Sequence, residues 1–144
     1  MSRIVSFRGQ LTDGAMDTIP LQTIRGLIGY KIVKFDVMGV TENENYEASI
    51  KIYSIQQAGA TTLIDFSDNT LLAAALYHDY STATIPAHQT IVFDSITFNQ
   101  DIYVTYAEVS GSGPAINYYI ELEQTDLAMD EATVATLKDI RNND

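Results

Sequence analysis

The chain has 144 residues, no cysteine and a formal net charge of −11. Its length suits a single domain with its own core, and the lack of cysteine excludes thiolate metal sites and thiol nucleophiles. Between Lys51 and Lys138 there is no lysine or arginine, so the whole net charge arises from residues 52–137. Such a region repels phosphate groups and anionic lipids, and we expect neither nucleic acid nor membrane as a partner.

Short runs of β-branched and aromatic residues, separated by turn signals, predict seven or eight antiparallel strands. In chain order the candidates are residues 4–7, 19–24, 30–38, 46–52, 61–65, 90–93, 101–109 and 116–124. Alternation in residues 46–52 places Ile50 and Ile52 in the core and directs Lys51 and Tyr53 outward. The turn-rich loop 110–114 predicts that the last two strands pair as a hairpin.

Two segments show helical rather than strand spacing. Ser67 is a candidate N-cap, and Leu72 and Leu76 follow at helical intervals, which predicts a helix over residues 66–77. Near the C-terminus Val134, Leu137 and Ile140 form a narrow apolar stripe. We expect an amphipathic helix there, which covers a sheet edge or faces a neighbouring subunit.

These elements together predict a mainly β fold. The expected architecture is an antiparallel β-sandwich or jelly roll with one short internal helix and a C-terminal amphipathic helix. One domain would span residues 1–144, with a helical tail over about 126–144.

Three tyrosines are expected on outward strand faces: Tyr53, Tyr103 and Tyr119. Tyrosine combines a large flat apolar area with a polar hydroxyl, which suits a subunit interface or a platform for sugar stacking. Coverage by a second layer of the fold is the third possibility. The absence of tryptophan argues against the sugar platform.

The sequence carries no enzyme signature. Glu121 and Glu123 are the best-placed carboxylate pair, because i and i+2 residues on one strand lie roughly 6–7 Å apart, a spacing near that of inverting glycosidases. Alternation nevertheless places both on a solvated face. His78 and His88 lack the spacing of a metal site. We therefore expect no catalysis, no cofactor and no metal.

Four segments carry a resemblance to a known group of proteins: FSD at 66–68 with LAAA at 72–75, NQDIYVTY at 99–106, INYYIELE at 116–123 and EATVATLK at 131–138. They resemble small virion-associated structural proteins of marine tailed bacteriophages, of the head-decoration (cement) or tail-accessory type. The resemblance implies a non-enzymatic protein that is made in the host cytoplasm and resides in the virion. It also implies self-association, commonly as a trimer, and contact with phage capsid or tail proteins.

The charge pattern indicates which side of such a protein would dock. Residues 1–51 balance their acidic side chains with basic ones, among them Arg3 and Arg8, which could supply cations to an acidic shell. The alternative function is a carbohydrate-binding or adhesion module of a tail fibre, with Tyr53, Tyr103 and Tyr119 as stacking rings.

Overall fold

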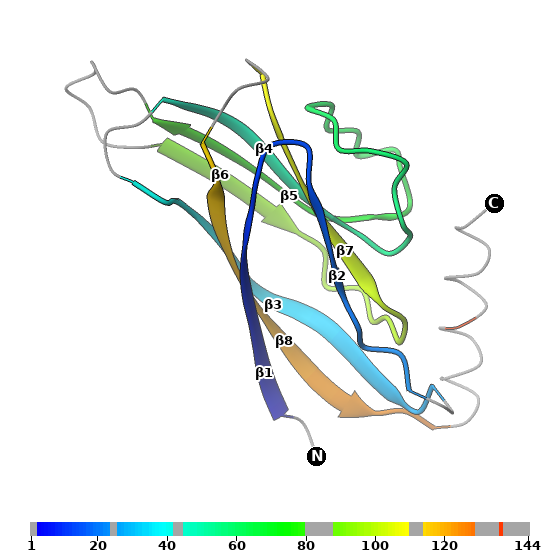
Figure 1. Cartoon of the computed structure of the whole chain (residues 1–144). Helices are drawn as coiled ribbons and strands as arrows, with labels where there is room; N and C mark the ends of the chain where they lie inside the picture. Colours follow the sequence, from blue (N-terminus) through cyan, green and yellow to red (C-terminus); the bar gives the residue numbers. More distant parts are fainter. Residues whose placement is uncertain are drawn as a thin grey trace.

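The computed structural model describes residues 3–23, 26–41, 45–79, 88–109, 114–128 and 136. Within them the chain is mainly β, and its strands form two antiparallel sheets (Figure 1). The strands are β1 (Arg3–Leu11), β2 (Met16–Ile19), β3 (Ile28–Gly39), β4 (Tyr46–Tyr53), β5 (Leu71–Asp79), β6 (His88–Phe93), β7 (Ile102–Glu108) and β8 (Ile116–Asp126).

The three-stranded sheet has the order β1-β8-β3, and the five-stranded sheet has the order β2-β7-β4-β5-β6. Consecutive strands therefore change sheet four times: between β1 and β2, β2 and β3, β3 and β4, and β7 and β8. The inward faces of both sheets meet in one hydrophobic cluster, in which Ile50, Val104 and Ile120 have no exposed surface. A hydrogen bond from the Tyr118 hydroxyl to Asp17 Oδ2, 2.9 Å long, joins β8 to β2 and links the sheets.

The expected pairing of the last two strands is wrong. β7 pairs with β2 and β4, whereas β8 pairs with β1 and β3, so the connection between them is a crossover. Two buried tyrosines hold the end of this connection, just before β8. Tyr46 donates to Ala115 O, Tyr106 donates to Pro114 O, each at 2.7 Å, and both fix the chain where it enters the second sheet.

The helix expected over residues 66–77 is also wrong, because its second half is β5. β5 has β4 on one side and β6 on the other, and Leu71 to Ala75 are all buried. A strand buried on both faces reads as a continuous apolar run without alternation. The residues expected to cap the helix form turns instead. Asp65 Oδ1 accepts a hydrogen bond from Ser67 N, and Asp68 Oδ1 accepts one from Thr70 N.

Six of the expected strands lie within or largely overlap β1, β3, β4, β6, β7 and β8. The strand expected at 19–24 is instead β2, which ends at Ile19 because Pro20 has no N–H to donate. The Leu21 and Gln22 amides donate to Asp101 Oδ1 rather than to a neighbouring strand. Residues 61–65 form no strand. The expected C-terminal helix lies outside the described residues.

Candidate interaction face

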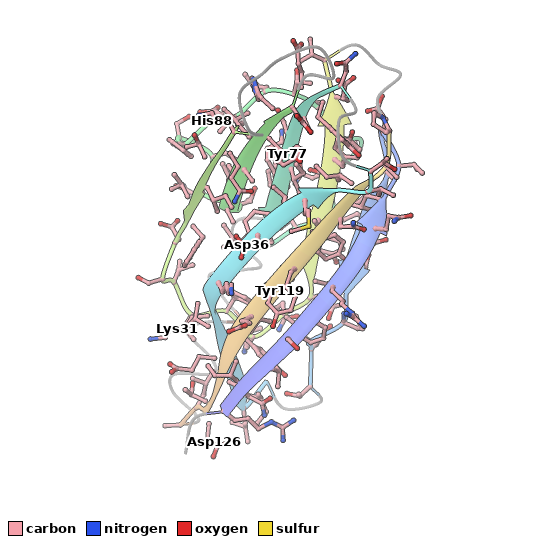
Figure 2. The ribbon with its side chains drawn as sticks, turned by 90° about the vertical axis from the view of Figure 1, so that its left-hand side faces the viewer. Lys31, Asp36, Tyr77, His88, Tyr119 and Asp126 are labelled. Carbon is pink, nitrogen blue, oxygen red and sulfur yellow. The ribbon has the colours of Figure 1, made fainter. Side chains whose placement is uncertain are left out.

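The outward side of the three-stranded sheet carries a mixed set of polar, charged and aromatic side chains, which we call the β1–β8–β3 face (Figure 2). Strand register arranges them in rows across β1, β8 and β3. The rows are Ile4, Glu123, Lys31; Ser6, Glu121, Lys34; Arg8, Tyr119, Asp36; and Gln10, Asn117, Met38. Together they offer donors, acceptors and both signs of charge on one side of the molecule.

Tyr119 lies at the centre of this face. Register places it directly between Arg8 and Asp36, and its hydroxyl donates to Glu121 Oε2 at 2.8 Å. The Lys34 ammonium lies 5.7 Å from the centroid of its ring, within range of a cation–π interaction. The hydrogen bond to the Glu121 carboxylate raises the pKa of Tyr119 above its ordinary value. The same hydrogen bond directs the phenol hydroxyl along the strand toward Glu121.

The cations of β1 and β3 differ in whether they have partners. Arg8, Lys31 and Lys34 belong to the outward rows, whereas Arg3, opposite Gln124, begins β1 on the alternate side of the strand. Lys31 pairs with Glu123 at 3.3 Å, and Lys34 lies 3.8 Å from Asp36. Arg3 and Arg8 are exposed and form no ion pair with any described residue. An exposed pair contributes at most about 1 kcal/mol, so Lys31 and Lys34 can also exchange their partners. Arg3 and Arg8 are the cations most available to another molecule.

The exposed lysine and arginine side chains of the described residues lie on one sheet only. Among the described residues, basic side chains other than Lys51 lie only on β1 and β3, and Lys51 is 1 % exposed. The described surface of the five-stranded sheet therefore presents no lysine or arginine to solvent. Carboxylates lie on both sheets, Glu121 and Glu123 of β8 among them, so it is the described cations and not the acidic residues that are confined to one side of the fold.

Lys51 and Tyr53 do not face solvent, contrary to expectation. The segment 54–70 between β4 and β5 covers this side of the sheet, and Tyr53 is 8 % exposed. The Lys51 ammonium donates to Thr61 Oγ1 at 3.0 Å and to Leu63 O, and lies 5.6 Å from the Tyr53 ring centroid. Alternation gave the correct side of β4, but that side is covered.

The three tyrosines expected on outward faces do not share one surface. Tyr53 and Tyr103 are directly opposite each other on β4 and β7, where Tyr103 is half-buried. Tyr119 belongs to the other sheet. Arg8 and Tyr119, in contrast, are direct neighbours on β1 and β8, although the sequence indicates one by its charge and the other by its aromatic ring. Their proximity follows from the strand register, which the sequence alone does not reveal.

The carboxylates considered for catalysis lie on the same face. Glu121 accepts the Tyr119 hydroxyl and Glu123 pairs with Lys31, so neither occupies the apolar pocket that a general acid needs. Among the described residues, no three His, Asp or Glu side chains gather as a metal site would require. The same residues contain no helix long and apolar enough to cross a membrane.

The expected C-terminal stripe of Val134, Leu137 and Ile140 lies outside the described residues. Thr136 is the one described residue after Ala128, and its hydroxyl accepts a 2.8 Å hydrogen bond from Asn99 Nδ2. The same amide donates to Gly26 O at 3.0 Å. This contact joins Thr136 to the loop that precedes β7.

Comparison of this chain with protein-family models, with curated proteins and with solved structures finds no match. Its function is therefore inferred from its own residues and geometry.

Proposed function

We propose that this protein is a non-enzymatic structural component of a phage virion, of the decoration or tail-accessory type. In this proposal the two sheets are the layers of a β-sandwich, and the β1–β8–β3 face docks onto the acidic surface of a capsid or tail protein. Copies of the chain also self-associate. The resemblance of residues 66–75, 99–106, 116–123 and 131–138 to virion-associated proteins supplies the biological setting.

The observation that carries the docking part is the position of Arg8. It is exposed, forms no ion pair with a described residue, and lies beside the half-buried ring of Tyr119. Arginine next to tyrosine, within a rim of paired charges, is the composition enriched at the centres of protein interfaces. The opposite sheet lacks exposed cations in its described part, so it would be repelled by the same acidic partner.

A carbohydrate-binding role has less support from the geometry. A stacking platform needs open aromatic rings, whereas Tyr53 is buried and the Lys34 ammonium lies near the ring of Tyr119. The hollow on the β1–β8–β3 face, about 890 Å³ and lined by Arg8, Asp36 and Asn117 among others, is the place where a glycan would bind. A glycan array with wild type and Tyr119→Ala distinguishes this role from docking.

We expect the double variant Arg3→Glu/Arg8→Glu to lose binding to virions from which the native protein has been removed. Two charge reversals against an acidic surface change an attraction into a repulsion, and we expect at least tenfold weaker binding at low salt. Co-sedimentation with the particles at two salt concentrations measures it. The difference from wild type should shrink at high salt because screening weakens both effects.

A matched control separates local docking from net charge. Arg8→Glu alone changes the charge by two units, and so does Gln56→Glu/Ala58→Glu on the exposed segment 54–70. Only Arg8→Glu should reduce occupancy if the β1–β8–β3 face docks. Equal losses in the two variants would contradict a specific face, and unchanged occupancy in the Arg3/Arg8 double variant would overturn the docking proposal.

A further inference from the structure

The two sheets leave four edge strands, and three of them carry features that oppose further strand pairing. β2 is only four residues long. β1 carries Arg3 and Arg8, and β3 carries Lys31 and Lys34 together with a bulge between Ile32 and Lys34. Short length, edge charges and bulges are the devices by which proteins prevent their sheet edges from pairing.

β6 has none of these devices. Its six residues, HQTIVF, contain no proline and no Asp, Glu, Lys or Arg, and it pairs with β5 without a register shift. Its other edge has no strand partner among the described residues. The apolar side chains here are also exposed, since Val92 retains 50 % and Phe93 38 % of its surface. β6 is therefore the edge best suited to accept another strand.

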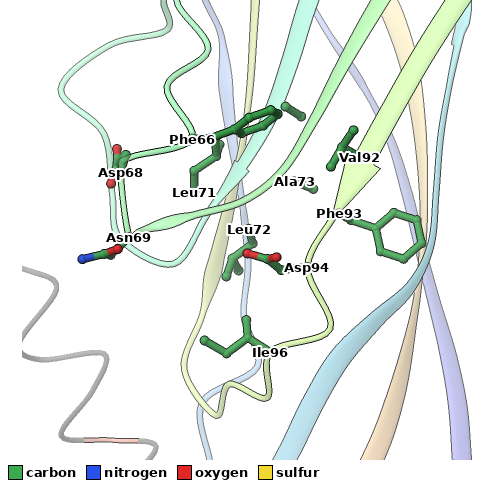
Figure 3. A pocket seen from close by; sticks show the side chains of 11 residues that line it. Phe66, Asp68, Asn69, Leu71, Leu72, Ala73, Val92, Phe93, Asp94 and Ile96 are labelled. Carbon is green, nitrogen blue, oxygen red and sulfur yellow. The ribbon is translucent and has the colours of Figure 1, made fainter.

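The surroundings of β6 extend this apolar surface. Figure 3 shows Val92 and Phe93 pointing to opposite sides of the strand, with Phe66 of the segment 54–70 on the side of Val92. A pocket of about 560 Å³ lies between them, with Leu72 and Ile96 in its lining. Phe66 is 70 % exposed. A strand added to β6 would cover part of this surface as well as the open edge.

We propose that β6 pairs antiparallel with β6 of a second copy, joining two five-stranded sheets into one continuous sheet across a two-fold axis. This inference rests on the self-association in the proposed function and names the surface responsible. Opposite residues in such a pair must belong to the same face of the sheet. The register that centres Ile91 on Ile91 of the second copy meets this condition.

That register also sets an imidazole, a hydrogen-bond donor, opposite a carboxylate. It sets His88 opposite Asp94 of the second copy on both sides of the axis, and Thr90 opposite Val92. The two Asp94 side chains are then six residues apart along the strand, about 20 Å. This distance exceeds the screening length of about 8 Å at physiological salt, so their repulsion is weak. The strongly acidic chain can thus meet its own copy through its neutral edge.

The absence of native cysteine gives a direct test by disulfide trapping. Directly opposite residues in an antiparallel pair have Cα atoms about 4.5–5.5 Å apart, which a disulfide can bridge. Purified Ile91→Cys should form a covalent dimer with oxidised glutathione at micromolar protein. Met38→Cys, exposed on the β1–β8–β3 face, should not. Equal cross-linking of both variants would overturn the proposed register.

Because Ile91 is half-buried, a second variant tests the edge without changing the core. Light scattering should give twice the chain mass of 15.9 kDa for wild type, and Val92→Lys should weaken the dimer at least tenfold. A monomer, or a trimer that Val92→Lys leaves intact, would overturn the β6 pairing. A monomer would also remove self-association from the proposed function. Neither result alters particle binding through Arg3 and Arg8, so failure of the β6 pairing is distinguishable from failure of docking.

Discussion

Replacing Lys51 by alanine is expected to lower the free energy of unfolding by about 2–4 kcal/mol, within the usual range for truncating a large buried side chain. Lys51 is 1 % exposed beneath the segment 54–70, and its ammonium donates to Thr61 Oγ1 and Leu63 O. Alanine removes both hydrogen bonds and the aliphatic stem that fills the space above β4. Urea unfolding followed by circular dichroism measures the change.

Methionine at position 51 separates the stem from the charge. It keeps most of the volume and flexibility of lysine but has no donor. Thr61 and Leu63 are exposed, so their freed oxygen atoms can bond to water. We therefore expect Lys51→Met to cost less than half of what Lys51→Ala costs. Equal losses would show that the ammonium, and not the packed stem, holds this segment to the sheet.

The pH dependence of the same pair gives an independent check. Burial lowers the pKa of Lys51 below its ordinary value of 10.5, although Asp68 acts in the opposite direction. Between the folded pKa and 10.5 the unfolded chain binds more protons than the folded chain, so stability rises with pH in that window. We expect wild type to gain stability relative to Lys51→Met as the pH rises toward 10.5. A loss over this interval would contradict the effect of burial.

Alternation along a strand predicts which side chains share a face, and it does so well here. Tyr46, Ile50 and Ile52 of β4 are fully buried, as are Ile120 and Leu122 of β8. Alternation does not tell whether the other face is covered, which depends on where a long connection lies. It also fails for β5, because Leu71 to Ala75 are buried on both faces of the strand and therefore show no alternation.

The candidate face shows a similar division between what is local and what is not. Arg8 could be chosen from the charge pattern, and Tyr119 from the alternation in β8. Their direct pairing follows from β1 meeting β8 in one particular register. That register depends on how the chain crosses between the sheets. It brings together residues more than one hundred positions apart in the sequence. A turn-rich loop such as 110–114 serves a crossover as readily as a hairpin, so the sequence favoured the wrong partner for β8.

The largest loss is expected when the two tyrosines at this crossover both lose their hydroxyls. Tyr46 and Tyr106 have no exposed surface, and Tyr46 also accepts a 2.9 Å hydrogen bond from Val40 N. In Tyr46→Phe/Tyr106→Phe the carbonyls of Pro114 and Ala115 lose these donors. An unsatisfied buried group costs about 1–3 kcal/mol. Pro114 and Ala115 are half-buried and Val40 N also loses its acceptor, so we expect about 2–5 kcal/mol for the double variant. The control is Tyr103→Phe, because the Tyr103 hydroxyl forms no hydrogen bond with a described residue.

Single and double variants should also be non-additive, because both tyrosines hold adjacent carbonyls of one crossover. Once either bond is lost the chain can shift, and the second loss then costs less than it does alone.

The stability of the protein at alkaline pH reports on Tyr106 separately. Burial first, then the carboxylates of Glu108 and Asp13, raise its pKa well above 10. The unfolded phenol therefore ionises first, and wild-type stability falls above about pH 10. Tyr106→Phe should fall less steeply, and parallel curves would mean that this hydroxyl is open to solvent.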